Sequence, residues 1–245
     1  MGFFITQAYG TDERVRYHRE TRNGSYVVKD STMGGERVRL LLVNGVQESA
    51  THLDPGRKYE PLFRYLTFFQ EIVESHPHPE RVLLIGGAGF AYPKLFFSSG
   101  QRGSLAVVEM DPRMIRLARR FFFLDDLERE YDLRDSERLK IHVNEGLDFL
   151  EHTEEKWDVI LNDAYLGNTP DAGLLSDRGI AACRAHLEED GILALNIITP
   201  LAGEDAMRGI MARKRFEEYF SRVDLYPCDP THAPTMRQNC MLTGR

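Results

Sequence analysis

The sequence predicts an α/β fold with a seven-stranded, mostly parallel, doubly wound sheet and a small antiparallel β-meander at the N-terminus. Two observations predict the large sheet. Short apolar segments alternate with segments of helical spacing along residues 81–243. Within them, Arg81-Val-Leu-Leu-Ile-Gly-Gly-Ala-Gly89 gives a buried strand and a glycine turn, and Val107-Val108-Glu109 gives a second strand with an acidic end. Turn dipeptides near the N-terminus predict the meander.

Residues 1–58 are predicted to form a β-rich subdomain. Arg14-Val-Arg-Tyr-His18 alternates in polarity, and the dipeptides Asn23-Gly24 and Asn44-Gly45 are strong hairpin signals beside β-branched and leucine-rich runs. We therefore expect three or four antiparallel strands between residues 13 and 50.

Residues 59–245 are predicted to form the larger, nucleoside-binding domain, which begins with a linking helix over 59–75. Apolar residues recur there at helical spacing, and His76-Pro-His-Pro79 ends the helix. The alternation that follows predicts strands at 81–86, 104–109, 139–143, 157–162, 191–197, 222–227 and 238–243, and helices near 91–99, 112–122, 146–151, 174–187 and 204–220.

The connection between the last two predicted strands has no helical pattern. Asp229-Pro-Thr-His-Ala-Pro234 reads as a loop, and a short loop joins antiparallel strands. Seven strands with the last one reversed is the architecture of the methyltransferase-type Rossmann fold.

Composition narrows the class of protein. The net charge of -7 argues against nonspecific nucleic-acid binding, because affinity for phosphate comes from lysine and arginine. No apolar run approaches the roughly 20 residues that span a bilayer, and the first residues do not form a signal peptide. Three scattered cysteines, Cys183, Cys228 and Cys240, indicate reduced thiols in a cytoplasmic protein, and the histidines show no metal-binding spacing.

The predicted strand ends carry the candidate site, since ligands of open α/β sheets bind beyond the carboxyl ends of the strands. Glu109 follows Gly89 by twenty residues, a spacing that suits a carboxylate holding ribose hydroxyls. Carboxylates repel phosphate but suit hydroxyls, an adenine amino group and a cationic sulfonium or amine, so a nucleoside fits better than a pyrophosphate. The four strand ends supply Gly86, Gly87, Ala88 and Gly89; Glu109, Met110 and Asp111; Asn144, Glu145 and Gly146; and Asn162, Asp163, Ala164 and Tyr165.

Each of these residues also has a purely structural interpretation. Asp111 before Pro112 suits a helix N-cap with proline at the first helical position. Glu145 suits a helix N-terminal acid, and Asp163 suits a loop acid or another N-cap. Gly86 and Gly87 suit a tight turn, and Glu109 suits a solvated strand end.

The chain resembles spermidine synthase and its relatives, the polyamine aminopropyltransferases. The resemblance lies in the glycine loop, in Val108-Glu-Met-Asp-Pro112, in Asn144-Glu-Gly-Leu-Asp-Phe-Leu150 and in Trp157-Asp-Val-Ile-Leu-Asn-Asp163. The hairpin Leu42-Val-Asn-Gly-Val-Gln47 is similar to the family's L-D-G-V-x-Q turn. The resemblance implies an S-adenosylmethionine-type cofactor, decarboxylated in the family, with methylthioadenosine as product and a small-molecule amine as acceptor.

The resemblance also implies residue roles. Glu109 would hold the ribose, Glu145 would lie near the adenine, and Asp163 would deprotonate or orient the attacking amine as the catalytic residue. Tyr65 and Tyr165 would contact the amine. The cofactor-binding set implied is Gln47, Gly86, Gly87, Gly89, Glu109, Met110, Glu145, Gly146 and Asp163, with no metal.

Three departures from the family pattern keep alternatives open. Gly89 stands where the family's G-G-G-D-G-G loop has an Asp for the aminopropyl ammonium, Leu166 stands at a second Asp, and Tyr65-Leu-Thr replaces a Tyr-His-Glu element. The alternatives are an S-adenosylmethionine-dependent methyltransferase for an unknown small substrate and a noncatalytic nucleoside-binding protein. Fold alone does not choose among them.

The apolar content of residues 59–73 and of the N-terminal hairpins indicates a self-association surface. The family resemblance likewise implies a homodimer. The net charge and the lack of a long apolar run predict that neither nucleic acid nor a membrane is a partner.

Overall fold

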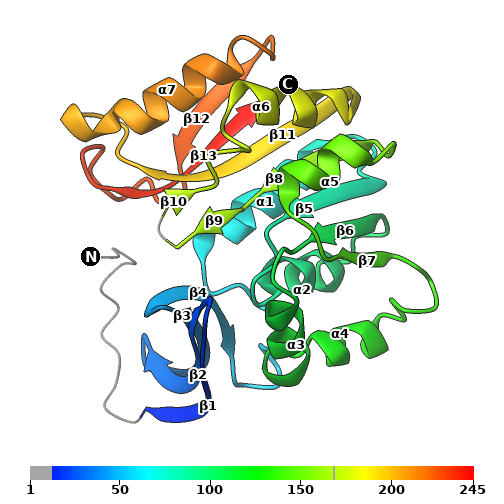
Figure 1. The fold of residues 1–245 in the computed structure, drawn as a ribbon, viewed down its shortest axis with the longest axis vertical. Coiled ribbons are helices and arrows are strands. Elements are labelled where there is room, and N and C mark those ends of the chain that lie inside the picture. Colours follow the sequence, from blue (N-terminus) through cyan, green and yellow to red (C-terminus); the bar gives the residue numbers. More distant parts are fainter. Residues whose placement is uncertain (1–12, 168) are drawn as a thin grey trace.

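The structure is a computed structural model that describes residues 13–167 and 169–245. Its centre is a seven-stranded sheet in the order β12-β13-β11-β8-β5-β6-β7 (Figure 1). The strands are β5 (Arg81–Ile85), β6 (Ser104–Val108), β7 (Leu139–His142), β8 (Trp157–Asn162), β11 (Leu187–Thr199), β12 (Val223–Pro227) and β13 (Gln238–Gly244). Strand β13 is antiparallel to both of its neighbours, whereas β11, β8, β5, β6 and β7 pair in parallel. The predicted fold class is therefore confirmed.

Helices cover both faces of this sheet because its central strands are apolar on both sides. Val82 and Leu84 of β5 belong to one core cluster and Leu83 and Ile85 belong to the other. The first face is covered by α1 (Arg64–Ser75), α2 (Ala91–Ser98), α3 (Pro112–Phe121) and α4 (Leu124–Glu130). The second face is covered by α5 (Gly146–His152), α6 (Asp177–Ala185) and α7 (Met207–Phe216). A short 3-10 turn, η1 (Glu204–Ala206), precedes α7. A doubly wound sheet of this kind leaves its strand ends as the place for a ligand.

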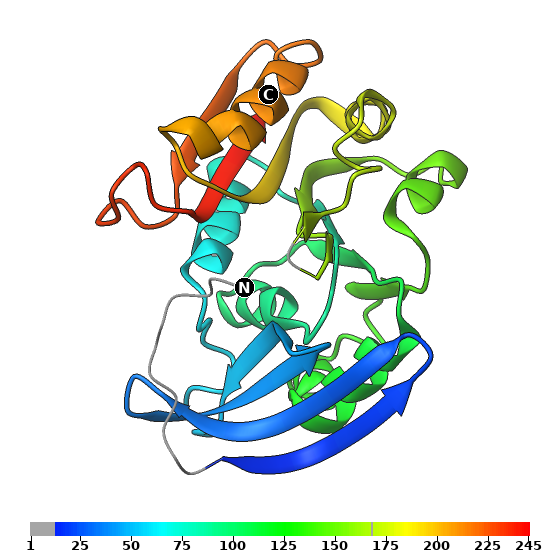
Figure 2. The same cartoon turned by 60° about the vertical axis from the view of Figure 1, so that its left-hand side comes forward.

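The N-terminal strands form a separate four-stranded antiparallel sheet in the order β1-β2-β3-β4. They are β1 (Arg14–Thr21), β2 (Gly24–Met33), β3 (Glu36–Val43) and β4 (Val46–His52). Figure 2 shows this sheet at one end of the molecule, against α2 and α3. Tyr26 and Leu41 pack with Leu117 and Phe122 at the end of α3. The sheet is thus attached through a shared apolar cluster, and it closes one side of the strand-end region.

Several element boundaries differ from the prediction. The linking helix begins at Arg64 rather than at residue 59, because Leu62 and Phe63 pack against the N-terminal sheet instead of continuing the helix. Helix α4 was not predicted, since it has seven residues and begins directly after Phe123, whose backbone is left-handed (φ 64°). The short strands β9 (Tyr165–Leu166) and β10 (Thr169–Pro170) were also missed.

The apolar residues of the linking helix do not form a surface. Leu66, Phe69, Ile72 and Val73 are all buried in the main core. These four side chains therefore do not supply the exposed apolar surface expected of the segment, because the helix uses them to cover the sheet. Self-association itself stays a prediction. Among the described residues, no helix combines the length and apolar character needed to cross a membrane.

Candidate functional site

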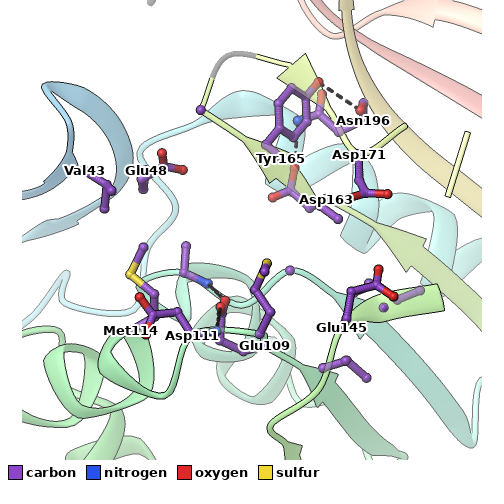
Figure 3. Close-up of a pocket in the computed structure, with 18 of the residues that line it drawn as sticks. Val43, Glu48, Glu109, Asp111, Met114, Glu145, Asp163, Tyr165, Asp171 and Asn196 are labelled. Atoms are coloured by element: carbon purple, nitrogen blue, oxygen red, sulfur yellow. Dashed lines mark hydrogen bonds between the residues drawn. The ribbon is translucent and has the colours of Figure 1, made fainter. Parts of the chain in front are cut away.

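A cavity of about 650 Å³ lies at the carboxyl ends of β5, β6 and β8, closed on one side by the N-terminal sheet. Figure 3 shows Glu109, Glu145 and Asp163 around it, with Glu48 on the wall that the N-terminal sheet supplies. The cavity has the size of a small-molecule site and occupies the position where such folds bind ligands.

Glu109 is held by the glycine loop. One carboxylate oxygen, Oε2, accepts from the backbone N–H groups of Gly87 (3.0 Å) and Ala88 (2.8 Å), and Oε1 accepts from the N–H of Asp111 (2.8 Å). Burial raises the pKa of Glu109, and these three hydrogen bonds oppose the rise. A carboxylate has about four acceptor directions, so one on Oε1 remains for a hydroxyl group of a ligand.

Gly86 allows the loop to approach β8. Its backbone has φ of 97°, and a Cβ atom at this position would lie 2.6 Å from the carbonyl oxygen of Asp163. A side chain would therefore be strained and would also collide with backbone. Gly86 thus lets the carboxyl ends of β5 and β8 lie close together, and this places Asp163 beside the glycine loop.

Asp163 is the centre of a hydrogen-bonded network. The Tyr65 hydroxyl donates to Oδ2 (2.9 Å) and the Asn196 amide nitrogen donates to Oδ1 (2.9 Å). Burial raises the pKa of Asp163 to about 6, although both hydrogen bonds act to lower it. A carboxylate that titrates near neutrality and lines a cavity is suited to accept a proton.

Tyr165 also lines the cavity, but its hydroxyl is engaged by the backbone of β11. It donates to the carbonyl oxygen of Asn196 and accepts from the N–H of Ile198, each at 3.1 Å. The ring therefore forms a fixed wall next to Asp163.

Two predicted acids have the structural roles that the sequence also allowed. Glu145 is the N-cap of α5 and accepts from the N–H groups of Leu147 and Asp148. Asp111 is the N-cap of α3, with Pro112 in the first turn, and it also accepts from Tyr26 and Arg113. Both still line the cavity.

The remaining predicted residues divide into two groups. Gln47, Met110 and Gly146 line the cavity. Gly87 and Gly89 are not among the lining residues: Gly87 contacts Glu109 through its N–H, and a Cβ atom at Gly89 would lie 2.4 Å from the Ser49 Oγ. Gly89 therefore serves the packing of β4 on the loop.

Sequence reasoning missed several polar residues of the cavity wall, of which Asn196 and Glu48 matter most for the site. Asn196 interrupts the apolar run of β11, and that interruption is a usable signal. Glu48 follows Gln47 directly after the Asn44-Gly45 turn, and nothing local marks it as a cavity residue.

The cavity is strongly acidic. Among the described residues that line it, six are carboxylic acids and one, Arg113, is a base, which donates to Asp111 at 2.9 Å. The potential inside therefore favours a cationic ligand. No group of three or more histidine, cysteine or acidic side chains in the described part of the chain is arranged to hold a metal ion.

Several curated proteins are similar in sequence to this chain. One curated relative, a polyamine aminopropyltransferase of Agathobacter rectalis, is 29% identical over 171 residues, which covers 69% of this chain and 56% of the relative. A polyamine aminopropyltransferase of Shigella boydii is 23% identical over 219 residues, covering 89% of this chain and 70% of the relative. The match to the first relative thus spans little more than half of its length.

A solved structure shares the fold. A spermidine synthase in complex with the transition state analogue AdoDATO superposes with a TM-score of 0.71 at 18% identity, covering 94% of this chain and 73% of that one. Residues 70–241, more than half of the chain, match the family model described as the spermine/spermidine synthase domain. The chain therefore belongs to the spermine/spermidine synthase domain family.

Proposed function

We propose that this protein transfers an aminopropyl group from decarboxylated S-adenosylmethionine to a small-molecule amine. The observation that carries the proposal is the acidic cavity at the strand ends with Asp163 at its centre. Its support is the family to which the chain belongs and the relatives that are polyamine aminopropyltransferases.

The donor substrate fits the cavity by its chemistry. The open acceptor direction on Glu109 suits a ribose hydroxyl, and the wall near Asn144 and Glu145 suits the adenine. The sulfonium and the ammonium of the donor are both cations, which the excess of carboxylates stabilises.

The reaction is a single displacement. The lone pair of a neutral amine attacks the propyl carbon next to the sulfonium, the carbon–sulfur bond breaks, and its electron pair remains on sulfur to give methylthioadenosine. The new secondary ammonium then loses a proton, for which Asp163 is the acceptor. Tyr65 and Asn196 fix the orientation of this carboxylate, so that positioning supplies much of the acceleration.

Methyl transfer and noncatalytic binding are not favoured, because the matching family model is that of the synthases and not of methyltransferases. A methyl donor would also bring the methionine carboxylate into an acidic cavity.

Mass spectrometry of the products tests the proposal. Wild-type protein incubated with decarboxylated S-adenosylmethionine and a panel of mono-, di- and triamines should release methylthioadenosine and one aminopropylated amine. A parallel incubation with S-adenosylmethionine should leave the amines unmethylated. Methylated amines and no aminopropylated product would establish the methyltransferase instead.

A further inference from the structure

Glu48 lies at an irregularity of the N-terminal sheet. Leu41 of β3 pairs with Ser49 of β4, and Leu42 pairs with Gln47, so that Glu48 is the extra residue between two paired ones. Such a bulge redirects a side chain. Gln47 and Ser49 are buried, whereas Glu48 is half-buried and lines the cavity. Figure 3 shows it beside the N-terminal sheet, across the cavity from both Asp163 and Glu145.

Among the six described carboxylates that line the cavity, Glu48 differs from the other five because no described residue donates a hydrogen bond to it. The others are held by backbone N–H groups, hydroxyls, an amide or a guanidinium: Glu109, Asp111, Glu145, Asp163 and Asp171. Among the described residues, no N–H or O–H group donates to the Glu48 carboxylate, and no lysine, arginine or histidine forms an ion pair with it. Burial, Asp163 and Glu109 together raise the pKa of Glu48 to about 7. A carboxylate in this setting is stabilised by a cation that a ligand brings.

The position of Glu48 relative to the glycine loop indicates which part of a ligand it meets. Ser49, its neighbour in β4, packs directly on Gly89, where a Cβ atom would lie only 2.4 Å from the Ser49 Oγ. In Rossmann-type folds the substituent on the 5′ carbon of the ribose lies over this loop. The propyl chain of a sulfonium donor is such a substituent, so its terminal ammonium would extend toward β4.

The glycine loop of this chain has no room for a carboxylate at residue 89, since a side chain there would collide with Ser49. Glu48 places a carboxylate at the same junction from the other side, on β4 instead of on the loop.

We propose that Glu48 binds the primary ammonium of the donor's propyl chain and thereby selects a decarboxylated donor over one that carries a carboxylate. This assignment rests on the proposed function. Glu48 attracts an ammonium and repels the carboxylate of S-adenosylmethionine. It therefore sets the ratio of the affinities for decarboxylated S-adenosylmethionine and S-adenosylmethionine, and not the affinity for the nucleoside that both contain.

Calorimetric titration of the full chain with three ligands tests the assignment: decarboxylated S-adenosylmethionine, S-adenosylmethionine and methylthioadenosine, which has neither charged end group. In Glu48→Gln, affinity for the decarboxylated donor should fall about 10- to 100-fold, the size of one hydrogen bond to a charged group. Affinity for methylthioadenosine should stay within about twofold, which also shows that the variant is folded. Glu48→Asp should recover part of the loss. Glu20→Gln, which removes an exposed acid of the same sheet, should change none of the three affinities.

Four other outcomes would overturn the assignment. Equal weakening of all three ligands would mean that Glu48 only shapes the cavity. An unchanged affinity for the donor with a raised KM for the amine would place Glu48 at the acceptor. If the wild type binds none of the ligands, the proposed function fails together with this assignment. If the wild type binds methylthioadenosine but does not prefer decarboxylated S-adenosylmethionine over S-adenosylmethionine, only the role of Glu48 is overturned.

Discussion

At the scale of single residues, Asp163 combines a fixed orientation with an unusual affinity for protons. Asp163 directly follows β8, and its carboxylate accepts hydrogen bonds from Tyr65 on α1 and from Asn196 on β11. Residues from three elements therefore fix the orientation of this carboxylate. Burial raises its pKa to about 6. The carboxyl is thus protonated and inactive as a base below that pH and ionised above it.

Two consequences follow for Asp163. In the wild type, kcat/KM for the donor should rise with pH through about 6, because this quantity reports groups of the free enzyme. Asp163→Asn should lower kcat by about 10²- to 10⁴-fold and should remove this step from the pH profile. Steady-state kinetics between pH 5 and 8 measures both. Unchanged kcat in the variant would exclude Asp163 from proton transfer.

Lys94 is a second residue with an unusual environment, outside the cavity. Its side chain is 1% exposed, and its ammonium donates to the Thr51 hydroxyl (2.7 Å) without forming an ion pair to any described acid. Burial lowers its pKa to about 7. The folded protein therefore binds this proton less tightly than the unfolded chain does.

Replacing Lys94 should stabilise the protein. Between pH 7 and the ordinary lysine pKa of about 10.4 the unfolded chain binds more protons, so this residue makes wild-type stability increase with pH. Lys94→Met should raise the free energy of unfolding by about 1–4 kcal/mol at pH 7, with a smaller gain near pH 10. Urea unfolding at both pH values tests this. A less stable variant at pH 7 would mean that the ammonium has a stabilising partner.

At the scale of elements, the junction between β4 and the glycine loop determines the geometry of the site. Ser49 occupies the space in which a side chain at residue 89 would lie. Because Glu48 precedes Ser49, the packing at this junction also sets where the Glu48 carboxylate stands.

Gly89→Ala should therefore cost about 1–3 kcal/mol of stability through overpacking against Ser49. Ser49→Gly removes the colliding atoms, so the double variant should lose less than the sum of the two single losses. Urea unfolding of the four proteins gives the coupling energy. Additive losses would show that the loop and β4 move apart freely.

The sequence predicts most elements but not all of their ends. Strand β5 and its glycine loop are recognisable because an apolar run meets a turn of small residues. The start of α1 cannot be recognised from the sequence, since Leu62 and Phe63 have helical spacing but pack on the N-terminal sheet. Helix α4 is too short for its periodicity to stand out.

At the scale of the whole molecule, the cavity exists because two sheets meet. Glu109 and Asp163 are predictable, since each follows a strand of the large sheet directly. The position of Glu48 in the cavity wall is not predictable, because it depends on how the N-terminal sheet packs on α3. No local pattern contains that information. The boundary near residue 58 between the two parts remains a prediction.

The oligomeric state also remains a prediction. The family resemblance implies a homodimer, although the buried apolar side of α1 does not supply its interface. Sedimentation velocity at micromolar concentration should give twice the chain mass of 28.2 kDa. A sedimenting species of the chain mass alone would contradict it.

A crystal structure of the protein with methylthioadenosine tests most directly whether this cavity binds the nucleoside of the donor. We expect a ribose hydroxyl on Glu109, the adenine beside Glu145 and the thioether sulfur facing Asp163, with the space beyond the sulfur open toward Glu48. A nucleoside bound elsewhere, or one whose sulfur points away from Asp163, would contradict the claim that this cavity performs aminopropyl transfer.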